Sequence, residues 1–229
     1  MELKKIIEIV KQNISEKRFY HSQCVMERCI ELAKKFNVDV EIAAKVGIAH
    51  DIAKEMPAEE KLKYVEENNI EVDEIEIENS TLLHAKIGAD IAIKKLNFTN
   101  EMGQAILAHT TGIENMTLLD KILFISDRTS KERGFPDIEY LNNLLEENID
   151  KAVLYILDKK ITCLEGAGYL YFESYYNSRI QMLRKLIGSE GSPWLWRMMG
   201  PAPCFLTCGW PMYSVVPRIT TLFCNNTPL

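Results

Sequence analysis

Every histidine of the chain falls on the apolar face of a separate helical segment, at His21, His50, His84 and His109. The spacing shows this for His50, which follows Val46 and Ile42 at steps of four. Two aspartates share such faces, because Asp51 directly follows His50 and Asp127 lies on a later helical face. Histidine and aspartate are uncommon in dry cores unless they are paired or bind something. The pattern favours an all-α bundle with metal ions at its centre.

A simpler interpretation applies to each histidine taken alone. One histidine on an apolar face is more often a hydrogen-bonded core residue than a metal ligand. The ordered series of histidines and aspartates, with one or two on each helix, is the arrangement that a di-metal site requires. We therefore predict metal binding from the set as a whole.

Composition limits the remaining choices. The chain has 229 residues, of which 47% are hydrophobic, enough for the core of one large domain or two small ones. A net charge of −6 with dispersed acidic residues argues against nucleic-acid binding. No apolar run reaches the length of a membrane span, and the first residues form a charged amphipathic pattern unlike a signal peptide. We expect a cytoplasmic protein in which Cys24, Cys29 and Cys163 are small buried hydrophobes.

The chain divides at about residue 187. Helical spacing with suitable breaks predicts helices over 2–16, 20–36, 39–54, 58–68, 80–96, 99–109, 116–130, 138–147, 149–165 and 167–187. The stretch 70–77 alternates with period two but has no second strand to pair with, so we expect a loop or short connector. Residues 1–187 are therefore expected to form one helical domain.

Residues 188–229 are different in kind. They hold all three tryptophans and six of the eight prolines, with no helical or strand period. A membrane or partner-binding tail is one interpretation. The interpretation that we favour is a disordered segment, or one not native to the fold, such as translation from another reading frame.

The series of histidines and aspartates, with the residues around them, resembles the HD superfamily of metal-dependent phosphohydrolases. More narrowly, it resembles the YqeK family of symmetrical bis(5′-nucleosyl)-tetraphosphatases. The resemblance covers about residues 1–187. The matching stretches are Arg18–Ser22, Ala49–Lys54, Leu83–Ala85, Ala108–Gly112, Met116–Ile122, Ser126–Asp127 and Glu132–Pro136. The chain departs from the family between Asp127 and Arg133, where Arg128 and Lys131 add positive charge that could change how the substrate is held.

The resemblance implies a di-metal centre. One metal would be held by His21, His50, Asp51 and Asp127, and the other by Asp51, His84 and His109. Asp51 would bridge the two metals, which makes it a candidate catalytic residue. Ligation without cysteine suits iron or manganese, and the family points to iron.

Further residues are candidates for contact with substrate. Arg18 lies one turn before His21, where it either reaches a phosphate or is a surface charge. Arg133 is a candidate catalytic residue, for the leaving phosphate, or else a solvated loop charge. The stretch His109, Thr110 and Thr111 could meet a polyphosphate, although the threonines could also cap a helix end. Lys54 is expected to act near the carboxylates, as a phosphate contact or a supporting charge.

The expected activity is hydrolysis of dinucleoside polyphosphates, with diadenosine tetraphosphate giving two ADP through a hydroxide held by both metals. One alternative is an HD phosphohydrolase that acts on nucleoside monophosphates or guanosine polyphosphates. Another is a nucleotide-binding regulator without catalysis. The expected partner is a nucleotide, with no nucleic acid and no membrane, and the sequence leaves open whether the chain forms a homodimer.

Overall fold

The computed structural model describes residues 1–166, 178 and 181, with the side chains of residues 74, 75 and 162–166 left out. Within these residues the protein is all-helical, as the sequence predicts, and contains no strand. The elements are α1 (Leu3–Asn13), α2 (Glu16–Lys35), α3 (Val40–Ala49), α4 (Ala58–Glu67), α5 (Glu74–Glu78), α6 (Leu83–Leu96), α7 (Asn100–Ala108), α8 (Leu118–Thr129), the 3₁₀ helix η1 (Lys131–Arg133), α9 (Ile138–Glu147) and α10 (Ile149–Gly166).

Local chemistry fixes where the helices begin. The Ser15 hydroxyl caps α2 by accepting a hydrogen bond from the backbone of Arg18, and the Asp39 carboxylate caps α3. Thr117 and Asp120 form a reciprocal capping box at the start of α8. Asn97 ends α6 in the left-handed conformation that asparagine tolerates better than most residues.

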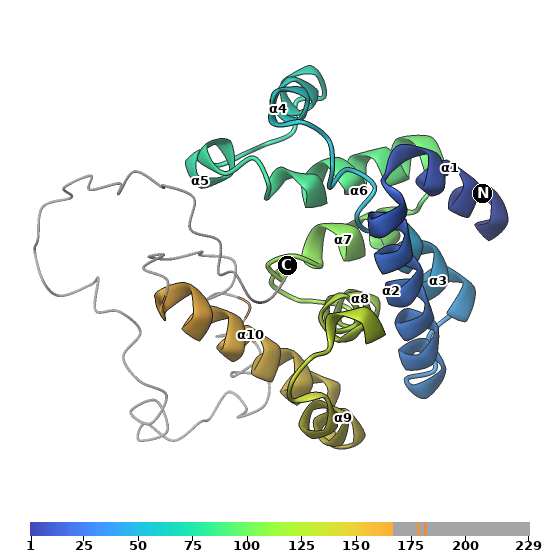
Figure 1. The fold of residues 1–229 in the computed structure, drawn as a ribbon, viewed down its shortest axis with the longest axis vertical. Coiled ribbons are helices and arrows are strands. Elements are labelled where there is room, and N and C mark those ends of the chain that lie inside the picture. Colours follow the sequence, from blue (N-terminus) through green and yellow to red (C-terminus); the bar gives the residue numbers. More distant parts are fainter. Residues whose placement is uncertain (167–177, 179–180, 182–229) are drawn as a thin grey trace, which may run out of the picture.

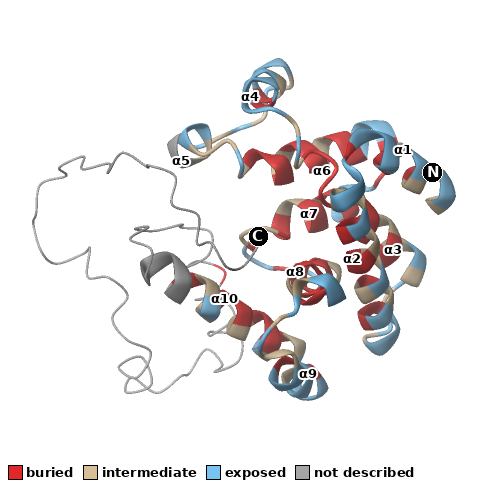
Figure 2. Ribbon diagram, viewed as in Figure 1, coloured by how far each residue is buried: buried red, intermediate tan, exposed pale blue. Residues whose placement is uncertain are grey.

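Helix α8 lies at the centre of the bundle. It packs against α2, α3, α7 and α10, and most of its residues are buried (Figures 1 and 2). Helices α2 and α3 pack closely together on one side, and α6 and α7 form the next pair. Helix α4 contacts α6, and with α5 it lies at the edge of the fold in Figure 1. The helices around α8 therefore converge on one interior region.

Several sequence expectations about element bounds were wrong. The helix expected over 2–16 ends at Asn13, and the one expected over 20–36 begins at Glu16. The stretch 70–77 is not all connector, because Glu74–Glu78 forms the short helix α5. Asp73 and Glu76 cap it reciprocally, as each side chain accepts a hydrogen bond from the other's backbone N–H. The helix expected over 39–54 ends at Ala49, and residues 50–55 form turns.

Other expectations have mixed outcomes. Cys24 and Cys29 are buried free thiols, as predicted, whereas the Cys163 side chain is not among those described. The helix expected over 167–187 is described only at residues 178 and 181, both helical, and the tail over 188–229 lies outside the described residues. Among the described helices, none combines the length and the apolar character that crossing a membrane requires.

Candidate metal centre

The predicted ligands lie at helix ends that converge in the interior. His50 and His109 are the C-cap residues that directly follow α3 and α7, and Asp127 lies in the last turn of α8. The C-terminal end of a helix carries partial negative charge, which favours a cation nearby. His21 lies in α2 and His84 in the first turn of α6. The side chains of these five residues and of Asp51 are all buried.

Asp51 stands between two groups of histidines. Its Oδ2 lies 3.4 Å from His50 Nε2 and 3.7 Å from His21 Nε2. Its Oδ1 lies 3.4 Å from His84 Nε2 and 3.7 Å from His109 Nε2. One carboxylate therefore faces one pair of histidines with each of its oxygens. This is the geometry that a bridging ligand needs.

Asp127 lies beside the first pair of histidines. Its Oδ1 lies 3.1 Å from His21 Nε2 and 3.6 Å from His50 Nε2. On the other side of Asp51, the Nε2 atoms of His84 and His109 are 3.2 Å apart. Within the described residues, the groups of side chains close enough to hold a metal ion are His21–His50–Asp51 and Asp51–His84–His109.

The histidine rings are oriented by their other nitrogens. The Nδ1 atoms of His50, His84 and His109 face the backbone carbonyl oxygens of Gly47, Thr81 and Ile106 at 2.8, 2.6 and 2.5 Å. A carbonyl only accepts, so Nδ1 carries the proton in each ring. In a neutral ring the Nε2 lone pair then points toward Asp51, as a metal ligand requires.

Two of the candidate donor atoms also lack a hydrogen-bond partner in the described part of the chain, which fits the binding of a metal ion. Among the described residues, His50 Nε2 and Asp51 Oδ1 are buried polar atoms without a hydrogen bond of ordinary geometry. Buried polar atoms are nearly always satisfied, so such atoms at one place indicate an external partner. Imidazole nitrogens and carboxylate oxygens without sulfur suit divalent iron, manganese or zinc.

The charges of the cluster also favour a cation. Burial lowers the pKa of His50, but Asp51 and Asp127 outweigh it and raise the pKa to about 9. Burial and the nearby Lys54 ammonium hold the pKa of His84 well below its usual value. Although burial raises the pKa of Asp51, His50 and the other histidines bring it well below the usual range. The aspartates are therefore ionised, which suits them to bind a divalent ion.

Three basic side chains that the sequence singled out surround this cluster. Arg18 Nη1 lies 2.9 Å from Asp51 Oδ2, and Arg133 Nη2 lies 2.7 Å from Asp127 Oδ1. Lys54 Nζ lies 3.3 Å from His84 Nε2, and burial lowers the pKa of its amine. Neither arginine points away as a surface charge. All three are within reach of an anionic group bound at the cluster.

The two threonines after His109 differ in position. The Thr110 hydroxyl lies 3.2 Å from His109 Nε2 and 3.3 Å from His84 Nε2, so it faces the second histidine pair. The Thr111 hydroxyl instead donates to the carbonyl oxygen of Gly112 at 3.2 Å. The structure thus brings Thr110 to the cluster and turns Thr111 toward the backbone.

Sequence reasoning did not predict the contacts of two residues in this region, Arg128 and Glu132. Arg128 binds Asp127 Oδ2 and donates to the Thr110 carbonyl oxygen at 2.9 Å, so it links the ends of α8 and α7. Glu132 accepts a hydrogen bond from His21 Nδ1 at 2.5 Å. The departure from the family after Asp127 singles out Arg128 as a charge, whereas nothing in the spacing places Glu132 against His21.

An all-helical core with two histidine–aspartate groups joined by one carboxylate defines a class of helical proteins able to hold divalent cations. The HD domain family model matches residues 18–132. The chain belongs to the HD domain family.

Relatives of known name match most of this chain. The symmetrical bis(5′-nucleosyl)-tetraphosphatase of Halalkalibacterium halodurans is 34% identical over 161 residues, which cover 70% of this chain and 86% of that protein. The Bacillus subtilis protein of the same name is 31% identical over 155 residues, 67% of this chain and 83% of its own length. A crystal structure of a predicted HD superfamily hydrolase involved in NAD metabolism, from Clostridium acetobutylicum, superimposes with a TM-score of 0.76 at 31% identity, covering 81% of this chain and 98% of that one.

Proposed function

We propose that the chain is a symmetrical dinucleoside-tetraphosphate hydrolase, which cuts diadenosine tetraphosphate into two molecules of ADP. The observation that carries this proposal is the joined pair of histidine–aspartate groups ringed by Arg18, Lys54 and Arg133. The similarity to symmetrical tetraphosphatases over most of their length supports the choice of substrate.

The cluster is proposed to hold two divalent metals. His21, His50, Asp51 and Asp127 form the first subsite, and Asp51, His84 and His109 form the second. The metals are proposed to be iron, with manganese as the alternative. When bound, such ions lower the pKa of water and neutralise charge on phosphoryl oxygens. Asp51 holds the subsites together, because its two oxygens face different histidine pairs.

The basic side chains are proposed to bind and orient the polyphosphate. A tetraphosphate chain carries several negative charges, and water alone does not hold it in line for attack. Arg18 and Lys54 lie on either side of Asp51 and can bind non-bridging oxygens, with Thr110 as a hydroxyl contact. Arg133 is placed to receive the charge that develops on the departing ADP. Contacts of Thr111 and His109 with substrate remain predictions.

Symmetric cleavage defines the products. Attack of water on one of the two phosphorus atoms beside the central bridging oxygen breaks the bond from that phosphorus to the oxygen. One ADP leaves with the bridging oxygen, and the other takes the oxygen of water. We propose that the protein acts in the cytoplasm on such free nucleotides.

A product assay tests this function. Metal-loaded protein is incubated with diadenosine tetraphosphate, a nucleoside monophosphate and a guanosine polyphosphate, and the products are separated by ion-exchange chromatography. The proposal predicts two ADP for each diadenosine tetraphosphate and slower turnover of the others. AMP plus ATP as products would contradict symmetric cleavage. Preferential release of phosphate from a monophosphate would favour another HD phosphohydrolase, and nucleotide binding without turnover would favour a regulator.

A further inference from the structure

His21 differs from the other histidines in what holds its ring. The Nδ1 atoms of the other three face backbone carbonyl oxygens, whereas His21 Nδ1 lies 2.5 Å from Glu132 Oε1. Among the described residues, it is the histidine of the cluster whose Nδ1 is paired with a carboxylate. The two atoms come from residues 111 positions apart, so this contact depends on the tertiary fold.

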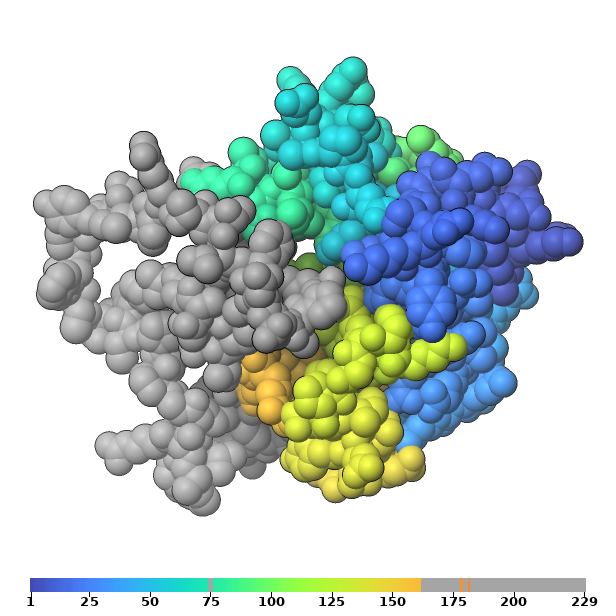
Figure 3. All heavy atoms as spheres, viewed as in Figure 1, coloured from blue at the N-terminus to red at the C-terminus, as the bar shows by residue number. Residues whose placement is uncertain are grey.

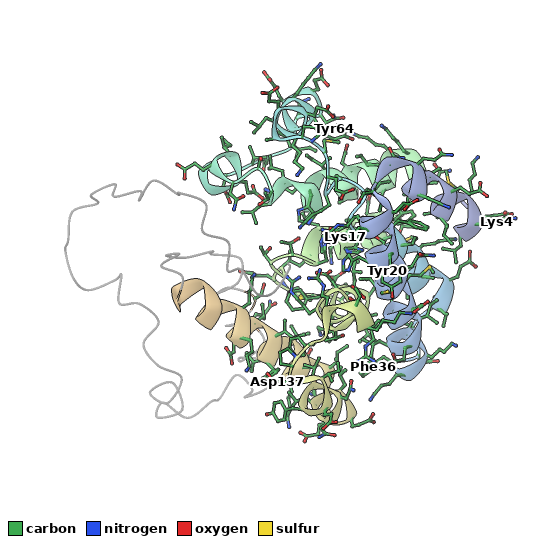
Figure 4. All side chains as sticks on the ribbon, in the orientation of Figure 1. Lys4, Lys17, Tyr20, Phe36, Tyr64 and Asp137 are labelled. Carbon is green, nitrogen blue, oxygen red and sulfur yellow. The ribbon has the colours of Figure 1, made fainter. Side chains whose placement is uncertain are left out.

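Glu132 is itself held in place. Its Oε1 accepts a hydrogen bond from the Ser130 hydroxyl at 2.6 Å. The Glu132 side chain is 18% exposed and that of His21 is 9% exposed, so little water reaches the contact. Figure 3 shows the segment after α8 lying directly against α2, and Tyr20 in Figure 4 marks the turn of α2 that carries His21. The carboxylate is therefore fixed before any metal binds.

A carboxylate that accepts from Nδ1 strengthens metal binding at Nε2 more than a backbone carbonyl does. It fixes the tautomer that leaves Nε2 free to coordinate, and its full negative charge makes that nitrogen more basic toward a cation. Loss of such a partner typically lowers metal affinity by 10–100-fold. In this chain the effect would fall on the subsite that contains His21.

We propose that Glu132 is a positioning residue that selectively strengthens the His21 subsite of the metal centre. This inference rests on the proposed function only in taking the cluster as the metal centre of that enzyme. In the second subsite, the Nδ1 atoms of His84 and His109 face backbone carbonyl oxygens rather than a carboxylate. The two subsites are therefore unequal in affinity, and Glu132 sets part of the difference.

The chain supplies a closely matched control. Glu27 on α2 forms an ion pair with Lys131 of η1 at 2.7 Å, so it joins the same two elements as the Glu132–His21 contact. Both partners of this pair are more than half exposed. Glu27→Gln therefore removes a carboxylate link between α2 and η1 without touching the cluster, and it isolates any purely structural effect.

The test measures Mn²⁺ binding to the chelator-treated full chain by equilibrium dialysis, with free Mn²⁺ read by electron paramagnetic resonance. For Glu132→Gln we expect one of two Mn²⁺ equivalents to weaken about 10–100-fold while the other changes little. Glu132→Asp should restore part of the lost affinity, and Glu27→Gln should bind as the wild type does. The thermal transition of each variant shows whether it is folded.

Several outcomes would overturn the inference. These are wild-type affinity for both equivalents in Glu132→Gln, equal weakening of both, or the same loss in Glu27→Gln. If Glu132→Gln does not fold, Glu132→Ala decides, because wild-type affinity for both equivalents in a variant without the carboxylate also contradicts the role. Substrate is absent throughout, so the result is independent of turnover. A wild type that binds two Mn²⁺ but releases no ADP would contradict the proposed function and leave this inference standing.

Discussion

Arg133 Nη2 lies 2.7 Å from Asp127 Oδ1 and 3.4 Å from His21 Nε2. An arginine six residues beyond a proposed metal ligand thus returns to the ligand cluster, because the chain turns through η1 directly after α8. Its side chain is 15% exposed. Its guanidinium group is therefore available at the edge of the site, where an anionic leaving group would depart.

We predict that Arg133→Ala lowers kcat for diadenosine tetraphosphate about a hundredfold, with KM changed less. A hundredfold loss corresponds to roughly 2.7 kcal/mol, the scale of one preorganised donor to a developing charge. Arg133→Lys should recover only part of the lost kcat, because an ammonium group lacks the planar two-point contact of a guanidinium group. Steady-state kinetics and metal analysis check this, with exposed Lys131→Ala as the control. A rise in KM alone would show that Arg133 only holds substrate.

Asp51 provides a second prediction, because its oxygens face both histidine pairs. Asp51→Ala should abolish turnover and reduce bound metal at both subsites, whereas His84→Ala should reduce it mainly at one. Metal content after anaerobic reconstitution, measured by inductively coupled plasma mass spectrometry, distinguishes the two variants. Near-normal activity of Asp51→Ala at saturating metal would rule out the bridging assignment.

The close packing of α2 against α3 gives a stability prediction. A Cβ added at Gly47 would lie 2.8 Å from the backbone Cα of Met26, too close to be relieved by a side-chain rotation. Gly47→Ala should therefore lower the free energy of unfolding by about 1–3 kcal/mol. At Gly88 the nearest atoms would be 3.5 Å away, so Gly88→Ala should be neutral or stabilising through helix propensity. Urea unfolding compares the two, and equal destabilisation would contradict this packing.

Cys29 gives a prediction about pH. Burial raises the pKa of its thiol to about 12. An unfolded thiol ionises near pH 8.5, so the unfolded state loses its proton first as the pH rises. The contribution of the thiol to stability is full below that value and is lost between about pH 8.5 and 12.

The free-energy difference between wild type and Cys29→Ala should therefore shrink by about 2–3 kcal/mol between pH 8 and 10.5. Urea unfolding at several pH values measures it, with Ala33→Gly, also in the α2 core, as a variant without a titrating group. A difference that stays constant with pH would show that the thiol ionises as readily in the folded protein.

The sequence predicts the convergence of the proposed ligands for a physical reason. Helical spacing places His21, His50 and Asp127 on apolar faces, and apolar faces must meet in the core. What spacing cannot supply is the contact between side chains remote in sequence. The Glu132–His21 pair depends on how η1 lies against α2, and the contact of Arg128 with Thr110 depends on where α7 ends.

The short helix α5 escaped prediction for a different reason. Its apolar residues alternate with acidic ones, which resembles a strand, and its helical start is determined by the reciprocal capping of Asp73 and Glu76. A further contact holds the element in place, because Lys86 of α6 binds Glu76 at 2.5 Å. Local caps and one tertiary ion pair outweigh a weak hydrophobic period over five residues.

The measurement that tests the metal centre most directly is a crystal structure of the anaerobically metal-loaded protein, with anomalous diffraction recorded on both sides of the metal absorption edge. The account predicts two anomalous peaks roughly 3.5–4 Å apart, the usual separation in two-metal sites. The Asp51 carboxylate should lie between them, with His21, His50 and Asp127 at one peak and His84 and His109 at the other. A single peak, or two peaks that Asp51 does not join, would contradict it.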